Sequence, residues 1–287
     1  MTTPINPFED VAIAMDAAHA AARELILTFP DRPVGRGVSP EAMAAAFDDP
    51  LPIDGIAAPV VVDEWLARAE PGIVATAGPR FFGWVFGGVT PGAIAGDWLI
   101  SALDQQGSLW TANPASVQTE HAVVRWLKQM FEIPDDWVGT TTSGATMSNM
   151  VGLSAGRQWV GQHLGFDPAL DGLAGNPIIP VVTSTEIHTS AIKALGHLGL
   201  GKRAIRKVAA PGGAIDLAAF AQELNTIDGP VLVVANAAEV NSGTFDDLNG
   251  MIDIARAHPG GAWVHVDGAF GLFARLSERT RHLVEGI

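Results

Sequence analysis

The chain has 287 residues, of which 17 are Lys or Arg and 31 are Asp or Glu, so its formal net charge is −14. Hydrophobic residues make up 48% of it, which is enough for a large buried core and argues against disorder. There is no cysteine, which excludes disulfides, thiol nucleophiles and cysteine-ligated metals. The acidic balance argues against nucleic-acid binding, and no apolar run approaches the ~20 residues of a membrane span. The start of the chain does not resemble a signal peptide, so we expect a cytoplasmic protein with no membrane partner.

Residues 1–90 are predicted to form an N-terminal helical arm that ends in a loop. Residues 8–29 are rich in alanine and carry apolar residues at helical spacing. Ser39 as N-cap and Pro40 at the first helical position predict the start of a second helix. Residues 71–92 mix four aromatic side chains with many glycines and prolines, which indicates a loop.

Residues 91–287 are predicted to form an α/β domain. Two helices joined by a turn are expected between Gly92 and Ile133, the second a clean amphipathic helix from Thr119 to Phe131. After Gly139, apolar strands alternate with helices, which indicates a mostly parallel sheet covered on both faces. The strands are predicted at Pro180–Ser184, Pro230–Ala235 and Ala262–Asp267, and the helices at Ser148–Leu164, Thr189–Leu198, Leu217–Leu224 and Leu248–His258.

The segment Thr141–Asn149, TTSGATMSN, is the first candidate site. Small and hydroxyl residues at the start of a helix present free backbone N–H groups, which together with the helix dipole attract an anion such as phosphate. An ordinary helix cap with a glycine turn is the alternative. The segment is neither a Walker motif nor a G-x-G-x-x-G fingerprint.

Asp267 and His188 are two further candidates, because each follows a predicted strand at the edge where ligands bind in open parallel sheets. Asp267 is compatible with a metal ligand, a base, a partner for a protonated ring nitrogen, or a simple turn residue. His188 is compatible with ring stacking, acid–base work or a helix cap. His265 is expected to pack within the sheet. No metal-binding spacing occurs in the sequence, and so we expect no metal.

Six strings, taken in their order, resemble the group II pyridoxal-phosphate (PLP) decarboxylases, which include glutamate, aromatic-amino-acid and diaminobutyrate decarboxylases. The resemblance extends from about residue 8 to Ile287. It implies the large domain of the fold-type I PLP enzymes, incomplete at the C-terminus and preceded by the helical arm. The strings are PRFFGWVFGGVTPGAIAGDWL, TANPASVQTEHAVVRWL, TTSGATMSNMVGLSAGRQW, EIHTSAIKALGHLGLG, EVNSGTFDDL and WVHVDGAFGLFA.

The resemblance implies a role for each matching residue around the cofactor. His188 would stack on the pyridine ring, and the Asp267 carboxylate would pair with the pyridine nitrogen and keep it protonated. Ala269 would lie beneath the ring, and Asn241 near the ring substituents. The cofactor phosphate would be held by Gly144, Ala145 and Thr146.

Two further segments would border the substrate: the aromatic loop with Phe81, Phe82 and Trp84, and the segment around Pro114. Relatives with aromatic, acidic or diamino substrates all keep aromatic residues in that loop, so several substrate classes stay open. The resemblance also implies a homodimer with its active sites at the interface, acting on a small-molecule amino-acid substrate.

The family's Schiff-base lysine stands in a D-x-H-K-W context beyond the HVDGAFG string, and none of the four lysines of this chain has that context. We therefore expect these residues to be the N-terminal part of a longer decarboxylase. Two alternatives stay open: a non-catalytic remnant or dimerisation partner of a full-length homologue, and another fold-type I enzyme such as an aminotransferase or a C–C lyase.

Overall fold

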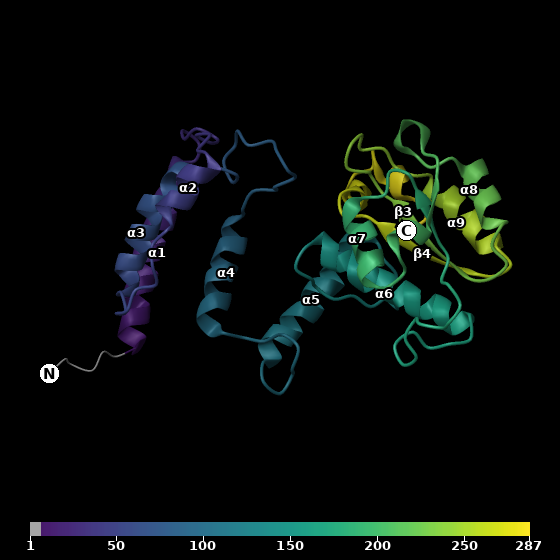
Figure 1. Ribbon diagram of the computed structural model, residues 1–287, viewed down its shortest axis with the longest axis horizontal. Helices are drawn as coiled ribbons and strands as arrows, with labels where there is room; N and C mark the ends of the chain where they lie inside the picture. The colour runs from purple at the N-terminus through teal and green to yellow at the C-terminus, as the bar shows by residue number, and fades with distance from the viewer. Residues whose placement is uncertain (1–6) are drawn as a thin grey trace. The chain divides into compact units, whose positions relative to one another are not determined.

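The structure, a computed structural model, describes residues 7–287 and divides into two compact units, one up to Asp104 and one from Gln105 (Figure 1). The boundary expected between residues 90 and 91 would separate the N-terminal arm from the cofactor-binding domain, and it stays a prediction. Within the described residues, no helix is both long and apolar enough to cross a membrane.

The first unit is helical. Ser39 caps its second helix as expected, because its hydroxyl accepts a hydrogen bond from the Ala42 N–H at 3.1 Å. The edge of the His19 ring meets Trp98 with the ring centres 5.4 Å apart, which joins the first helix to the last. The third helix was not predicted. The four helices are α1 (Pro7–Thr28), α2 (Pro40–Ala46), α3 (Ala58–Ala69) and α4 (Pro91–Leu103).

The second unit is a four-stranded sheet with helices on both of its faces. All strand pairs are parallel, and the strand order is β2-β1-β3-β4. Asn236 and Asp267, the last residues of β3 and β4, stand opposite each other in the register. The strands are β1 (Val181–Ser184), β2 (Ile205–Val208), β3 (Val231–Asn236) and β4 (Ala262–Asp267), and the helices are α5 (Pro114–Phe131), α6 (Ala145–His163), α7 (Thr189–His197), α8 (Leu217–Leu224) and α9 (Leu248–Ala257).

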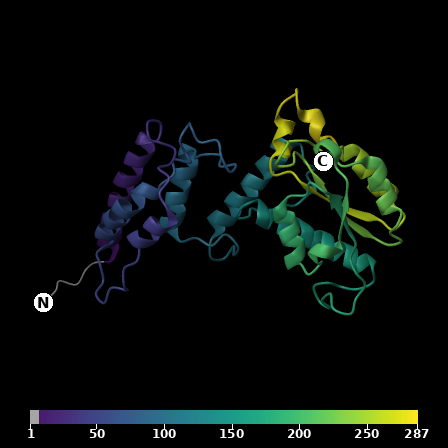
Figure 2. The same ribbon diagram turned by 45° about the horizontal axis from the view of Figure 1, so that its top comes forward.

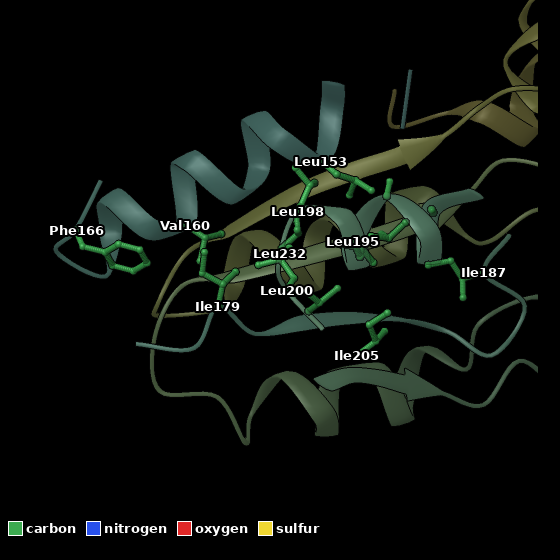
Figure 3. Close-up of a cluster of buried hydrophobic side chains, with 14 residues drawn as sticks. Leu153, Val160, Phe166, Ile179, Ile187, Leu195, Leu198, Leu200, Ile205 and Leu232 are labelled. Atoms are coloured by element: carbon green, nitrogen blue, oxygen red, sulfur yellow. The ribbon is translucent and has the colours of Figure 1, made fainter. Parts of the chain in front are cut away.

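The alternation of side chains along β3 separates two hydrophobic layers. Leu232 and Val234 face α6 and α7, where Leu153 and Leu195 are fully buried. Figure 3 shows these leucines meeting between helix and strand. The other β3 side chains, such as Val233, face α8 and α9. Figure 2 shows the strands between the two groups of helices, so the predicted parallel sheet with two covered faces is confirmed.

Helix α6 lies unusually close to the sheet because glycines face it. A Cβ on Gly156 would lie 2.6 Å from Leu232 and 2.7 Å from Trp263, and one on Gly152 would lie 2.7 Å from the His265 ring. Real Cβ atoms do not approach other atoms so closely, so these positions require glycine for the present packing. The close approach brings the first turns of α6 to the end of β4.

Candidate active site

A hollow of about 250 Å³ lies where the start of α6 meets the end of β4. This is the carboxyl edge of the parallel sheet, where open α/β folds bind ligands. The hollow brings together Ala145, Asp267 and Ala269, which sequence analysis had assigned to one site. Its lining consists of Ala145, Ser148, Asn149, His265, Val266, Asp267, Gly268, Ala269, Leu272 and Ile287.

The first turns of α6 line the hollow. Gly144 precedes the helix with φ 87° and ψ 163°, a conformation essentially restricted to glycine. The N–H groups of Met147 and Ser148 bond to the Gly144 carbonyl at 3.1 and 3.2 Å. The N–H groups of Ala145 and Thr146 come earlier, in the part of a helix that has no intrahelical acceptor. They are therefore available to an anion.

The carboxylate of Asp267, at the end of β4, also lines the hollow. Its Oδ1 accepts a hydrogen bond from the Ala269 N–H at 3.3 Å, and its Oδ2 accepts one from Asn149 Nδ2 at 2.9 Å. Each carboxylate oxygen thus accepts a hydrogen bond from a neighbouring residue, and Asp267 also lines the hollow. A fixed carboxylate of this kind can hold a positively charged ring nitrogen.

Asn149 also connects this carboxylate to His188. Its Nδ2 lies 3.0 Å from Ser190 Oγ, and Ser190 Oγ lies 2.6 Å from His188 Nδ1. His188 is exposed and caps α7, because its Nδ1 accepts the Ser190 N–H at 3.2 Å. The cap anticipated as one alternative is therefore present, and His188 reaches the hollow through Ser190 and Asn149.

His265 lies two residues before Asp267 and faces α6. Its Nε2 is 2.8 Å from Asn149 Oδ1. Desolvation lowers the pKa of His265, and the nearby negative charge of Asp267 opposes that shift. The sequence analysis placed Asn149 at the end of the candidate segment Thr141–Asn149 without a role for its side chain, did not identify Ser190, and assigned His265 to packing in the sheet. The available signal was spacing, because Asn149, Gly152 and Gly156 recur on one face of a helix.

The lining of the hollow does not include the other predicted site residues. Asn241 is in an exposed turn after β3, where its N–H bonds to the Glu239 carboxylate at 2.8 Å. Pro114 begins α5. The aromatic loop belongs to the first unit, with Phe82 94% and Trp84 88% exposed, and Phe81 packs against Phe86. The substrate-pocket roles predicted for Phe81, Phe82, Trp84 and Pro114 stay predictions.

The residues of the hollow fit a phosphorylated pyridine. The start of α6 offers free N–H donors, Asp267 offers a fixed carboxylate, and Ala269 contributes a small side chain to the lining. Among the described residues, no lysine lines the hollow. The same residues contain no group of three or more His, Asp or Glu placed to hold a metal ion.

Comparison with known proteins agrees with the resemblance to pyridoxal-phosphate decarboxylases. A family profile described as "Pyridoxal-dependent decarboxylase conserved domain" matches residues 40–287. The chain is 31% identical to human cysteine sulfinic acid decarboxylase over 222 residues, 75% of this chain and 43% of the relative. It is 28% identical to tryptophan decarboxylase 1 of Oryza sativa subsp. japonica over 265 residues, 87% of this chain and 49% of the relative.

The crystal structure of mouse CSAD in its apo form superposes with a TM-score of 0.86 at 27% identity, covering 98% of this chain and 59% of that one. The chain thus spans about half the length of the relatives it matches.

Proposed function

Because the chain belongs to the family of pyridoxal-dependent decarboxylases, we propose that the protein removes the carboxylate of an amino acid with pyridoxal 5'-phosphate as cofactor. The observation that carries the proposal is Asp267, a carboxylate held by Asn149 and Ala269 at the end of β4, in the same hollow as the start of α6. Fold-type I chemistry needs a phosphate site and an anion at the ring nitrogen, and the start of α6 and the Asp267 carboxylate, which both line this hollow, are suited to these two roles.

A bound pyridoxal 5'-phosphate would supply the electron sink for the bond pair that is left when CO₂ departs from Cα and is then taken up by a proton. The residues of this chain position it. The N–H groups of Ala145 and Thr146 bind the phosphate, and Asp267 keeps the ring nitrogen protonated. His188 would lie over the ring face. Rigid positioning matters because the bond that breaks must stand perpendicular to the ring plane.

We also propose that the protein is a homodimer acting on a free amino acid. Exposed apolar side chains on α1, among them Val11, Ile13 and Leu27, support an interface with a second copy. Relatives named as decarboxylases of tryptophan and of cysteine sulfinic acid indicate the substrate classes to try. The aromatic loop of Phe81, Phe82 and Trp84 is proposed as a border of the substrate pocket.

The test is CO₂ release by the protein expressed from its native gene and supplied with pyridoxal 5'-phosphate. Tryptophan, cysteine sulfinate, glutamate and 2,4-diaminobutyrate form the panel, and the organic product is identified in the same samples. We expect CO₂ and the corresponding amine from at least one of them. A keto acid without CO₂ would favour an aminotransferase, and no product from any substrate would favour a non-catalytic remnant.

A further inference from the structure

A single buried amide joins three elements at the carboxyl edge of the sheet. Asn149 on α6 is only 3% exposed. Its Nδ2 donates to Asp267 Oδ2 on β4 at 2.9 Å and to Ser190 Oγ on α7 at 3.0 Å, and its Oδ1 lies 2.8 Å from His265 Nε2. Both amide hydrogens and the amide oxygen therefore have partners. A fully satisfied buried polar group of this kind fixes one arrangement of its neighbours.

The direction of these hydrogen bonds follows from the donors and acceptors present. A flipped amide would set the Asn149 oxygen against a carboxylate oxygen of Asp267, and two acceptors repel. The amide nitrogen therefore faces Asp267, and its oxygen faces His265. Because that oxygen accepts, the proton of neutral His265 must be on Nε2.

The same reasoning continues to His188. Ser190 Oγ accepts from Asn149, which leaves its own hydroxyl hydrogen for His188 Nδ1 at 2.6 Å. The Ser190 N–H also points to that nitrogen, at 3.2 Å. Two donors converge on Nδ1, so it carries no proton. The neutral His188 ring therefore has its proton on Nε2.

We propose that Asn149 is a positioning residue of the cofactor site: it holds the Asp267 carboxylate in place as an acceptor and, through Ser190, fixes His188 with its proton on Nε2. The role towards the cofactor rests on the proposed function, whereas the hydrogen-bond directions do not. An apolar residue could fill the same volume, but Asp267, Ser190 and His265 would each lose the hydrogen bond that they make to Asn149. Asn149 thus determines both that Asp267 accepts a hydrogen bond and which nitrogen of His188 carries the proton.

The sharpest variant is Asn149→Asp, because it keeps the shape and removes both donors. A carboxylate at 149 would face Asp267 at hydrogen-bond distance, and the two acids would share one proton. We expect the affinity for pyridoxal 5'-phosphate, measured by equilibrium dialysis, to fall about tenfold or more. The matched control is Asn225→Asp at the exposed end of α8, which should bind as the unchanged protein does.

A second readout needs no cofactor. Nitrogen-15 NMR of the histidine side chains in the unloaded protein should show His265 and His188 protonated on Nε2 when neutral. Asp267 is the charged group already acting on His265, and Asn149→Asp spreads the negative charge of the proton-sharing pair onto the oxygen that contacts Nε2, so the pKa of His265 should rise. Ser190→Ala should shift the His188 Nδ1 signal, and Ser190→Thr, which keeps the hydroxyl, should restore it.

The outcomes separate the two proposals. If the unchanged protein binds the cofactor and Asn149→Asp binds it equally well, the positioning role is wrong and the proposed function survives. A proton on Nδ1 of neutral His188, or an unmoved His265 pKa in Asn149→Asp, would also overturn the inference. If the unchanged protein binds no cofactor while both histidines show the expected pattern, the proposed function fails, and the positioning role fails with it.

Discussion

Gly152 and His265 meet where α6 crosses β4, and a Cβ on the glycine would lie 2.7 Å from both Nδ1 and Cε1 of the imidazole. The ring can occupy this place only because position 152 has no side chain. From there, His265 Nε2 reaches Asn149 Oδ1 at 2.8 Å, across 116 residues of sequence. The closeness of helix and strand thus connects the packing of the fold to the polar groups of the site.

Gly152→Ala should destabilise the second unit. The added methyl group must displace the His265 ring or push α6 away from β4, and overpacking of this kind costs about 1–3 kcal/mol. The expected result is a lower free energy of unfolding in urea, with weaker cofactor binding because His265 no longer holds Asn149 in place.

Gly196→Ala in α7 is the matched control for that experiment. A Cβ at Gly196 meets only the aliphatic part of the Lys202 side chain, which can move away. Since alanine favours a helix over glycine by about 1 kcal/mol, this variant should be neutral or slightly more stable. An equal loss of stability in both variants would contradict the proposed role of Gly152.

His265 should make the protein less stable in mild acid. Desolvation lowers the pKa of His265 below its ordinary value of 6.5, so the unfolded chain binds a proton there more readily than the folded protein does. The stability that the neutral ring contributes is therefore present above pH 6.5 and is lost as the pH falls from 6.5 through the lowered pKa. Unfolding measured across this range should show a flatter pH dependence in His265→Gln than in the unchanged protein. Identical slopes would show that His265 does not contribute.

Asp246 is expected to be a structural carboxylate. It is 3% exposed and accepts the Asn236 N–H at 2.7 Å and the Ile215 N–H at 2.8 Å. Asp246→Asn would turn an NH₂ group towards one of these donors, and an unsatisfied buried donor costs about 1–3 kcal/mol. Urea unfolding at neutral pH should therefore show a loss of that size.

The neighbouring Asp247→Asn is its control. Asp247 caps α9 by accepting the Gly250 N–H, and asparagine is about as good a cap.

Burial raises the pKa of Asp246 above 3.8, so its contribution to stability should fall as the pH rises from 3.8 through the raised pKa and then stay constant. That dependence should disappear in Asp246→Asn and persist in Asp247→Asn.

Gly144→Ala should weaken the phosphate end of the site selectively. The φ of 87° and ψ of 163° at Gly144 strain any residue with a Cβ by about 1–3 kcal/mol. Relief of that strain would turn the first N–H groups of α6 away from the hollow. The affinity for pyridoxal 5'-phosphate should drop, while the weaker affinity for pyridoxal, which has no phosphate, should stay the same. An equal drop for both ligands would argue against a phosphate site at this helix.

Much of the α/β unit can be read from the sequence, because its buried strands are continuous apolar runs. The predicted Ala262–Asp267 agrees with β4, and Leu217–Leu224 agrees with α8. Strand β2 was missed because two of its four residues, Arg206 and Lys207, are exposed and charged. Helix α3 was not predicted, since its run of valines is not typical of a helix.

The candidate site was only partly predictable. Asp267 and the start of α6 stand out locally, because each adjoins a recognisable element. Asn149 ends the candidate segment Thr141–Asn149, but the sequence predicts no role for its side chain, since a polar residue near a helix start has an ordinary explanation as a surface group. Its function arises from contacts with Asp267, Ser190 and His265, 41 or more residues away in sequence. Such contacts depend on the close packing of α6 and become visible only in three dimensions.

The most direct test of the proposed cofactor site is the affinity for pyridoxal 5'-phosphate of the unchanged protein and of Asp267→Asn, measured by equilibrium dialysis at neutral pH. Asp253→Asn, on the exposed side of α9, is the control for the loss of one negative charge. We predict measurable binding by the unchanged protein and by Asp253→Asn, and about tenfold or weaker binding by Asp267→Asn, because a hydrogen bond to a charged group is lost. Equal affinity in all three proteins, or no binding by any of them, would contradict the account.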